Sequence, residues 1–395
     1  DRIFLGPQDN LPQEQASNKG RNTYYFLPFI LGIIGLIYQL NRDGRNFSVV
    51  MAFFIMTGVA IAVYLNSPPA EPRERDYVFA GSFYAFCMWI GFGVPALYEA
   101  FKRWFKRDHV YTAVAATLIG AIVPALLGAK NWDDHDRAGR FVARDFGMNY
   151  LKSALPNAII MNYGDNDTFP LWYAQEVEGV RPDVKIINLS YLGSEWYANQ
   201  QRMQTYDAAP VHFTAKPQDY AYGRRNVVYA LPTEFDEHKK QVPGTDFDTE
   251  TPLVDALKEI YAEEAVNPIH NEPMVRHANT FIEVDEEAVR KQGLVPDDQI
   301  PLDRIPVQLN SMTLGQLLML DIIATNAADG WKRPIYWACT VGTENYQQFL
   351  PYVRFTGMAY QLVPYEANGE TDTEITYGIV KKYLWGGADN YENPP

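Results

Sequence analysis

Long apolar stretches occupy the first third of the chain, and shorter apolar runs separated by polar segments occupy the rest. Four stretches near 22–41, 46–66, 77–99 and 110–129 are almost free of charged residues. A helix needs about 20 apolar residues to cross a hydrocarbon core about 30 Å thick, so each stretch is long enough to span a bilayer. The pattern predicts a membrane α-helical bundle of four spans over residues 1–129.

From residue 130 onwards the pattern changes to that of an α/β domain. Two short runs at 158–163 and 184–189 are rich in Ile and Val, and a segment of helical length separates them. This order predicts a β-α-β unit with two parallel, buried strands. We expect a soluble α/β domain with a mainly parallel sheet over 130–395. Its further strands are expected at 280–284, 335–341 and 358–363, and further helices at 253–265 and 314–326.

A membrane-proximal helix is expected between these two parts. Phe141, Val142, Phe146 and Tyr150 recur at helical spacing. Asp133 or Asp134 is expected to cap the N-terminus of this helix, where a carboxylate also complements the helix dipole.

The basic residues of the first part give an orientation in the membrane. The short connections 41–46 and 101–109 contain six cations, namely Arg42, Arg45, Lys102, Arg103, Lys106 and Arg107. Cytoplasmic loops carry an excess of Lys and Arg, so we expect both connections to be cytoplasmic. Residues 1–21, 66–76 and 130–395 would then lie on the outer side of the membrane.

Charge and motifs exclude several function classes. Residues 1–129 carry 11 Lys/Arg and 9 Asp/Glu, whereas residues 130–395 carry 23 and 39. A surface this acidic repels phosphate backbones, so nucleic acid is not an expected partner. Only two cysteines are present, one in each part. The motifs of serine hydrolases, zincins, P-loop proteins and dinucleotide-binding enzymes are absent.

A charged outward loop between two predicted spans is the first candidate site. It contains Glu71, Arg73, Glu74, Arg75 and Asp76 beside three prolines. A guanidinium offers planar, bidentate donors, so Arg73 and Arg75 are suited to hold a lipid-linked phosphate. The acidic residues are suited to accept a proton or to bind an acceptor. The alternative is a hydrophilic loop whose Arg and Glu side chains pair with one another.

The segment after the first predicted strand is the second candidate site, with Asp165, Asn166, Asp167, Thr168 and Trp172. Ligands of parallel sheets bind beyond the carboxyl ends of the strands, which is where this segment lies. Asp165 and Asp167 would hold a divalent metal ion, the one cofactor that the motifs suggest. The alternative is a tight turn in which Asp167 or Thr168 caps the following helix.

Four stretches of the sequence together resemble a known family. They are PAEPRERDYVFAGSFYAFCMWIGFG at 69–93, NWDDHDRAGR with ARDFGMNYL at 131–151, YGDNDTFPLWYAQEVEGVRPDV at 163–184, and GWKRPIYWACTV with GMAYQLVP. The family consists of polytopic bacterial membrane proteins of formerly unknown function. It is similar to the protein O-mannosyltransferases of the GT-C glycosyltransferase superfamily.

The resemblance implies a transferase of the bacterial inner membrane with residues 130–395 in the periplasm. Its partners would be a polyprenyl-phosphate sugar donor, a protein or other acceptor, and membrane lipids. We expect the chain to be the C-terminal part of a longer protein, with the catalytic acid upstream of Asp1. The main alternative is a non-enzymatic inner-membrane scaffold or partner in envelope secretion or assembly. A metal-dependent sugar-nucleotide site at Asp165 and Asp167 is a weaker alternative, because nucleotide sugars are cytoplasmic.

Overall fold

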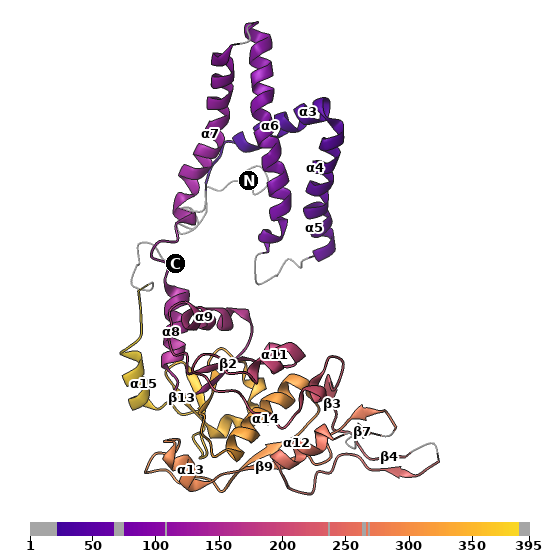
Figure 1. Ribbon diagram of the computed structural model, residues 1–395, viewed down its shortest axis with the longest axis vertical. Coiled ribbons are helices and arrows are strands. Elements are labelled where there is room, and N and C mark those ends of the chain that lie inside the picture. The colour runs from indigo at the N-terminus through magenta and orange to yellow at the C-terminus, as the bar shows by residue number, and fades with distance from the viewer. Residues whose placement is uncertain are drawn as a thin grey trace, which may run out of the picture. The chain divides into compact units, whose positions relative to one another are not determined.

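Two compact units make up the chain. The computed structural model describes residues 22–66, 75–106, 109–235, 238–262, 266–267 and 269–386. The first unit covers Asp1–Ala138 and the second covers Gly139–Pro395 (Figure 1).

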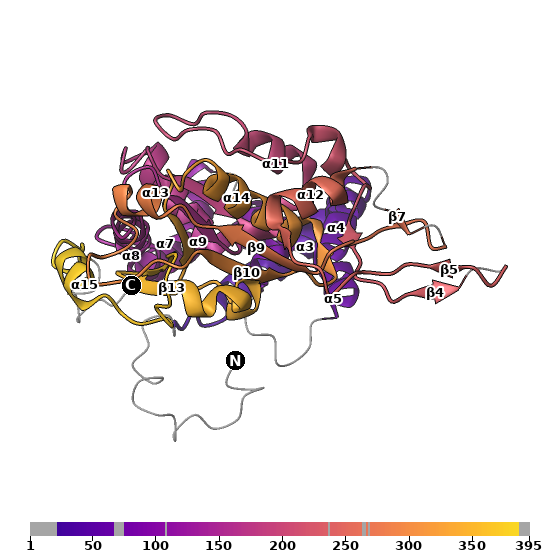
Figure 2. The same ribbon diagram turned by 90° about the horizontal axis from the view of Figure 1, so that it is seen from below.

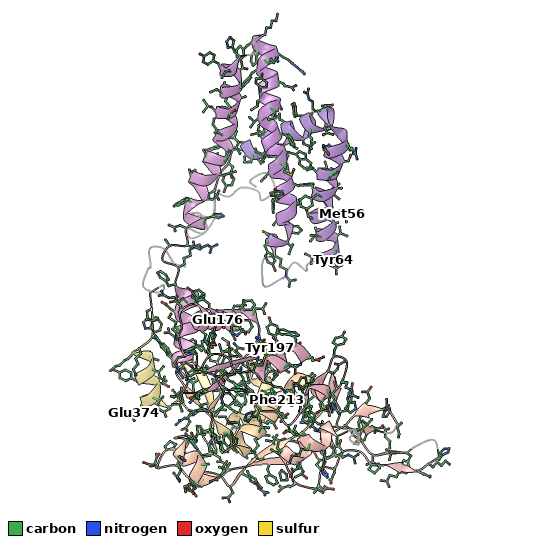
Figure 3. All side chains as sticks on the ribbon, viewed as in Figure 1. Met56, Tyr64, Glu176, Tyr197, Phe213 and Glu374 are labelled. Atoms are coloured by element: carbon green, nitrogen blue, oxygen red, sulfur yellow. The ribbon has the colours of Figure 1, made fainter. Side chains whose placement is uncertain are left out.

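The first unit is helical. Its elements are α3 (Leu27–Arg42), α4 (Gly44–Thr57), α5 (Val59–Leu65), the 3-10 helix η1 (Asp76–Phe79), α6 (Ala80–Phe105) and α7 (Val110–His135). Three helical stretches are long and apolar enough to cross a membrane: Gly44–Leu65, Asp76–Phe105 and Val110–Trp132. They correspond to three of the four predicted spans. Met56 and Tyr64, labelled in Figure 3, are 64% and 88% exposed, as expected for side chains that face lipid.

The fourth predicted span, near 22–41, is not confirmed. The helix in this stretch, α3, has only 16 residues. At 1.5 Å per residue it is about 24 Å long, shorter than the hydrocarbon core. Tyr25 and Phe26 have left-handed backbone conformations, with φ of 54° and 56°, and Pro28 occupies the first turn of the helix. These residues start the helix later than the apolar pattern alone suggests.

Small residues allow α3 and α6 to approach closely. A Cβ atom on Gly35 would lie 1.8 Å from the carbonyl oxygen of Trp89, and one on Gly93 would lie 2.5 Å from the Leu31 side chain. Trp89 is fully buried, and its Nε1 donates a hydrogen bond to Gln39 Oε1 at 2.8 Å. This pairing of glycine contacts with one polar contact is typical of helices that associate in a membrane.

The basic ends of α3 and α6 lie together. Glu99 pairs with Arg42 at 3.5 Å and with Arg103 at 3.7 Å. The predicted cytoplasmic connections therefore begin on the same side of the first unit, as the orientation prediction requires.

A five-stranded sheet forms the centre of the second unit. Its order is β13 (Val353–Thr356), β14 (Ala359–Leu362), β12 (Ile335–Ala338), β1 (Ile159–Asn162) and β2 (Lys185–Asn188). β1 is parallel to both β2 and β12, whereas β14 is antiparallel to β12 and β13. The predicted β-α-β unit is confirmed, but the sheet is mixed rather than mainly parallel. The reason is that β13 and β14 form a hairpin through the turn at Gly357, which adds two strands in alternating directions.

Helices and a smaller sheet surround these strands. The helices are α8 (Val142–Lys152), α9 (Asp165–Glu176), α10 (Leu189–Leu192), α11 (Glu195–Gln201), α12 (Leu253–Tyr261), α13 (Glu286–Lys291), α14 (Leu314–Ala328) and α15 (Thr373–Val380). All residues of β1, β2 and β12 are buried, so these strands run through the core. The apolar helix α14 contacts α10, α12 and the second sheet, and it is buried along most of its length.

The second sheet has the order β10 (Arg304–Gln308), β9 (Asn279–Glu283) and β6 (Thr251–Pro252). Three two-stranded pairs complete the unit: β11 (Met312–Thr313) with β3 (Val227–Val228), β4 (Glu234–Phe235) with β5 (Gln241–Val242), and β7 (Val266–Asn267) with β8 (Glu272–Pro273). Short 3-10 helices are η2 (Pro217–Tyr220), η3 (Thr343–Asn345) and η4 (Gln347–Tyr352). Figure 2 shows β4, β5 and β7 extending away from the rest of this unit.

The membrane-proximal helix begins later than predicted. Residues 133 and 134 continue α7, which ends at His135, and α8 starts at Val142 after Phe141. The predicted cap by Asp133 or Asp134 is therefore wrong. The helical propensity of the preceding apolar segment extends α7 past both aspartates, and Phe141 precedes α8 without a side-chain cap.

Candidate functional site

The carboxyl ends of three parallel strands meet at one edge of the central sheet. The segments that follow β1, β2 and β12 begin at Tyr163, Leu189 and Cys339. Because the three strands are parallel neighbours, these segments lie side by side. Ligands of α/β folds bind at such an edge, which we call the carboxyl edge.

A network of buried polar groups holds the segments of the carboxyl edge in place. Asn188 Nδ2 donates to Thr168 Oγ1 at 2.8 Å, and Thr168 Oγ1 donates to the Gly164 carbonyl at 2.8 Å. The backbone N–H of Asn188 donates to the hydroxyl of Tyr197, which Figure 3 labels, at 2.8 Å. All three side chains are at most 1% exposed. The network fixes the start of α9 against the end of β2.

Gly164 sets the direction in which α9 leaves the sheet. Its φ of 81° is a left-handed conformation that favours glycine, and α9 begins at the next residue, Asp165. The alternative cap by Asp167 or Thr168 is wrong, because both residues already lie within the first turn. Carboxylates in that turn complement the positive end of the helix dipole.

The two aspartates of this turn have different environments. Asp165 is exposed, and its carboxylate accepts a hydrogen bond from the Tyr191 hydroxyl, from the segment after β2. Asp167 is 8% exposed, and its carboxylate accepts a hydrogen bond from the Thr340 hydroxyl, from the segment after β12. Burial raises the pKa of the Asp167 carboxyl above its usual value, and the hydrogen bond from Thr340 opposes that shift.

A tyrosine and a cysteine extend the Asp167 contact. The Tyr150 hydroxyl, from α8, lies 3.0 Å from Cys339 Sγ and 3.3 Å from Thr340 Oγ1. Burial raises the pKa of Tyr150 well above its usual value, so this phenol stays protonated at neutral pH. Tyr150 was expected only as a residue of the membrane-proximal helix, and none of Tyr150, Tyr191, Cys339 and Thr340 was predicted from the sequence as a site residue. The parallel pairing of β12 with β1 is the signal that would have placed Cys339 and Thr340 beside Asp167.

The predicted residues of this site divide into two groups. Asp165, Asn166, Asp167 and Thr168 lie together in the first turn of α9. Trp172 is half-buried and packs against Phe169, with the rings tilted by 40° and 5.7 Å between their centroids. It lines a separate cavity of about 220 Å³ with Lys185, the first residue of β2. Trp172 is therefore not part of the carboxyl edge.

Asp165 and Asp167 would offer a metal ion two carboxylate groups. Among the residues that the structure describes, no group of three or more His, Cys, Asp or Glu side chains is placed to hold one. Asp165 and Asp167 each accept a hydrogen bond from a different hydroxyl. Magnesium is commonly bound through one or two carboxylates together with substrate phosphates, so the predicted metal role of this pair remains a prediction.

The outward loop of the first unit is described only at its end. Glu71, Arg73 and Glu74 lie outside the described residues. Arg75 directly precedes η1, Asp76 is the first residue of η1, and both side chains are exposed. Arg75 thus stands at the start of a stretch that is long enough to span a membrane.

Two adjoining cavities open beside the carboxyl edge. The first, of about 370 Å³, is lined by Tyr163 and Ser190 from the segments after β1 and β2 and by the first turn of α14. The second, of about 330 Å³, shares Gln316, Met319 and Asn345 with the first. Both volumes are in the range of small-molecule sites, about 300–1,000 Å³.

Comparison with known proteins identifies a family for the second unit. No curated protein and no solved structure matches the chain. The family described as TMEM260-associated domain 2 matches residues 143–380, from the start of α8 to the end of α15. Because the matched segment covers more than half of the residues of this chain, the chain belongs to the TMEM260-associated domain 2 family.

Proposed function

We propose that this chain is part of a membrane glycosyltransferase. It would transfer a sugar from a polyprenyl-phosphate donor to a protein or other acceptor on the periplasmic side of the bacterial inner membrane. The donor's lipid would lie in the membrane beside the apolar helices, and the second unit would hold the acceptor.

One observation carries this proposal. Two of the stretches that resemble the protein O-mannosyltransferase-like family, 163–184 and 330–341, are far apart in sequence but meet at the carboxyl edge. The hydrogen bond between Asp167 and Thr340 joins them directly. A shared role at this edge accounts for both stretches, because ligands of parallel sheets bind there.

The described residues suggest a division of roles. Arg75, at the start of an apolar stretch, is suited to hold the phosphate of the lipid donor through its guanidinium. Asp165 is exposed and is held by Tyr191, so it can accept a hydrogen bond from an acceptor hydroxyl. The resemblance assigns the catalytic carboxylate to no residue of this chain, so tests of activity use the protein expressed from the intact gene.

The scaffold alternative also has an observation in its favour. Phe169, Tyr173 and Val177 are exposed at successive turns of α9 and its C-terminal end. Apolar side chains at this spacing are typical of a helix face that binds a partner. A scaffold would tolerate the loss of single charged residues but not the loss of this helix face.

Glycan masses on envelope proteins test the proposal. They would be compared among cells with the intact gene, a deletion, Arg73→Ala with Arg75→Ala, and Asp165→Asn. Arg45→Ala and Asp297→Asn serve as matched controls, since both side chains are exposed and lie outside the proposed sites. We expect a defined sugar to be lost in the deletion and the arginine double variant, reduced in Asp165→Asn, and kept in both controls. Unchanged glycans in the deletion would contradict transfer to proteins.

A further inference from the structure

The two adjoining cavities beside the carboxyl edge share three lining residues and form one groove, which we call the amide groove. We propose that the amide groove binds an uncharged oligosaccharide. Its shared residues are Gln316, Met319 and Asn345. This proposal concerns binding alone and does not rest on the transfer reaction.

The lining of the groove combines apolar side chains with polar side chains that are nearly all uncharged. The first cavity has no charged lining residue, and the second has one, Glu344. Most of the other polar positions are Asn, Gln, Ser or Thr, whose side chains both donate and accept hydrogen bonds. A charged ligand would lose its hydration here without finding an opposite charge, whereas sugar hydroxyls match such groups one for one. The acidic composition of residues 130–395 further disfavours anionic ligands.

The protein itself uses the oxygen atoms of two of these amides. Gln316 Oε1 accepts from the backbone N–H of Thr313 at 2.9 Å, which caps α14. Gln348 Oε1 accepts from the backbone N–H of Gln308 at 3.0 Å. Within the part of the chain that the structure describes, neither Nε2 group donates a hydrogen bond to the protein. Each amide is therefore oriented by the protein and keeps its donors for the oxygen atoms of a ligand.

One aromatic face borders the same groove. Tyr163 lines the first cavity and is 51% exposed. The flat C–H face of a sugar ring packs on such side chains, since they combine a large apolar face with a polar edge.

The groove is less suited to an extended peptide. Peptides commonly add a strand to an open sheet edge, and β10 is the edge strand beside the second cavity. Pro306 in this strand has no backbone N–H, and the N–H of Gln308 already donates to Gln348. The remaining edge offers too few donors for strand addition.

The test uses the full chain in lipid nanodiscs, which avoids detergents with sugar head groups. Calorimetry would measure binding of mannotriose, maltotetraose, cellotetraose and chitotetraose, and of an uncharged Ser/Thr-rich peptide of ten residues. The variants are Gln316→Glu and Gln348→Glu. Glutamate keeps an oxygen for the Thr313 or Gln308 N–H, so the fold is preserved, but it removes the donor and adds a charge. Gln299→Glu adds the same charge at an exposed position outside the groove.

We expect at least one oligosaccharide to bind, with an affinity that 0.5 M salt leaves unchanged because the ligand is neutral. Gln316→Glu and Gln348→Glu should each weaken binding about tenfold or more, and Gln299→Glu should not. The proposal is overturned if no oligosaccharide binds, if both groove variants bind as the unaltered chain does, or if only the peptide binds.

Discussion

Replacing Thr340 by valine tests whether the carboxyl edge depends on the contact between β12 and α9. Valine has the shape of threonine without its hydroxyl, so the change removes the hydrogen bond to Asp167 and leaves the backbone unaltered. The Asp167 carboxylate is 8% exposed and would lose the side-chain donor that follows β12. The Tyr150 hydroxyl would also lose its neighbour at 3.3 Å.

The loss of folding stability in Thr340→Val depends on the burial and the protonation of the Asp167 carboxyl. A buried acceptor left without its partner costs about 1–3 kcal/mol, and Thr340 itself is exposed, so we expect about 1–2 kcal/mol at neutral pH. The folded Asp167 carboxyl has a raised pKa, so its proton is held to higher pH than in the unfolded chain, and stability falls as the pH rises through this interval. The valine variant raises that pKa further. The loss of stability caused by Thr340→Val should reach its full size at neutral pH. It should disappear below pH 3.8, the ordinary pKa of an aspartate, where the Asp167 carboxyl is protonated in both the folded and the unfolded chain.

Thermal unfolding in nanodiscs between pH 3.5 and 8 measures this effect. For a unit of this size, about 1–2 kcal/mol lowers the midpoint by about 2–8 °C. Hydrogen exchange of residues 163–170 should rise in parallel. Thr343→Val is the matched control, because Thr343 is exposed in η3. An unaltered midpoint at neutral pH, or a loss that does not depend on pH, would refute the role given to Thr340.

Two further predictions concern the packing of each unit. Gly35→Ala should lower the unfolding midpoint of the first unit, because its Cβ would lie 1.8 Å from the Trp89 carbonyl oxygen, whereas Gly91→Ala, with open space around it, should not. Equal midpoints for the two variants would contradict the α3–α6 contact. Arg181→Ala should cost the second unit about 2–4 kcal/mol, because the guanidinium donates to three backbone carbonyls and to Asp183. The hydrogen bond from Arg181 lowers the pKa of Asp183 to about 2, so this stability is present above pH 4 and lost toward pH 2. In Arg181→Ala the acid dependence of the midpoint should flatten, and an unchanged acid profile would count against this assignment.

Local sequence patterns were sufficient to predict many of the helices and strands. Helix α14 begins at Leu314 as predicted, because Thr313 and Gln316 form a capping box before a long apolar run. Strands β1 and β2 were predicted because short Ile-rich runs buried on both faces have no helical periodicity. The start of α3 was not, since it depends on the left-handed conformations of Tyr25 and Phe26.

The candidate site was predicted only in part, for a physical reason. Asp165 to Thr168 are contiguous, so a position after one strand was enough to find them. Their partners Tyr191 and Thr340 come from two other segments, and only the order of strands in the sheet brings these together. The sheet was predicted as mainly parallel for the same reason. The direction of β14 depends on the turn that joins it to β13, which the strand patterns alone do not give.

The most direct test of the proposed activity is donor turnover by the purified protein, expressed from the intact gene and held in nanodiscs. A panel of radiolabelled polyprenyl-phosphate hexoses would be supplied together with an extract of periplasmic proteins, and the release of polyprenyl phosphate would be measured. The account predicts release from one of these donors with label transferred to protein, lost in Arg73→Ala with Arg75→Ala and kept in Arg45→Ala. Donors that stay intact with a folded protein, or release that does not depend on these arginines, would contradict it.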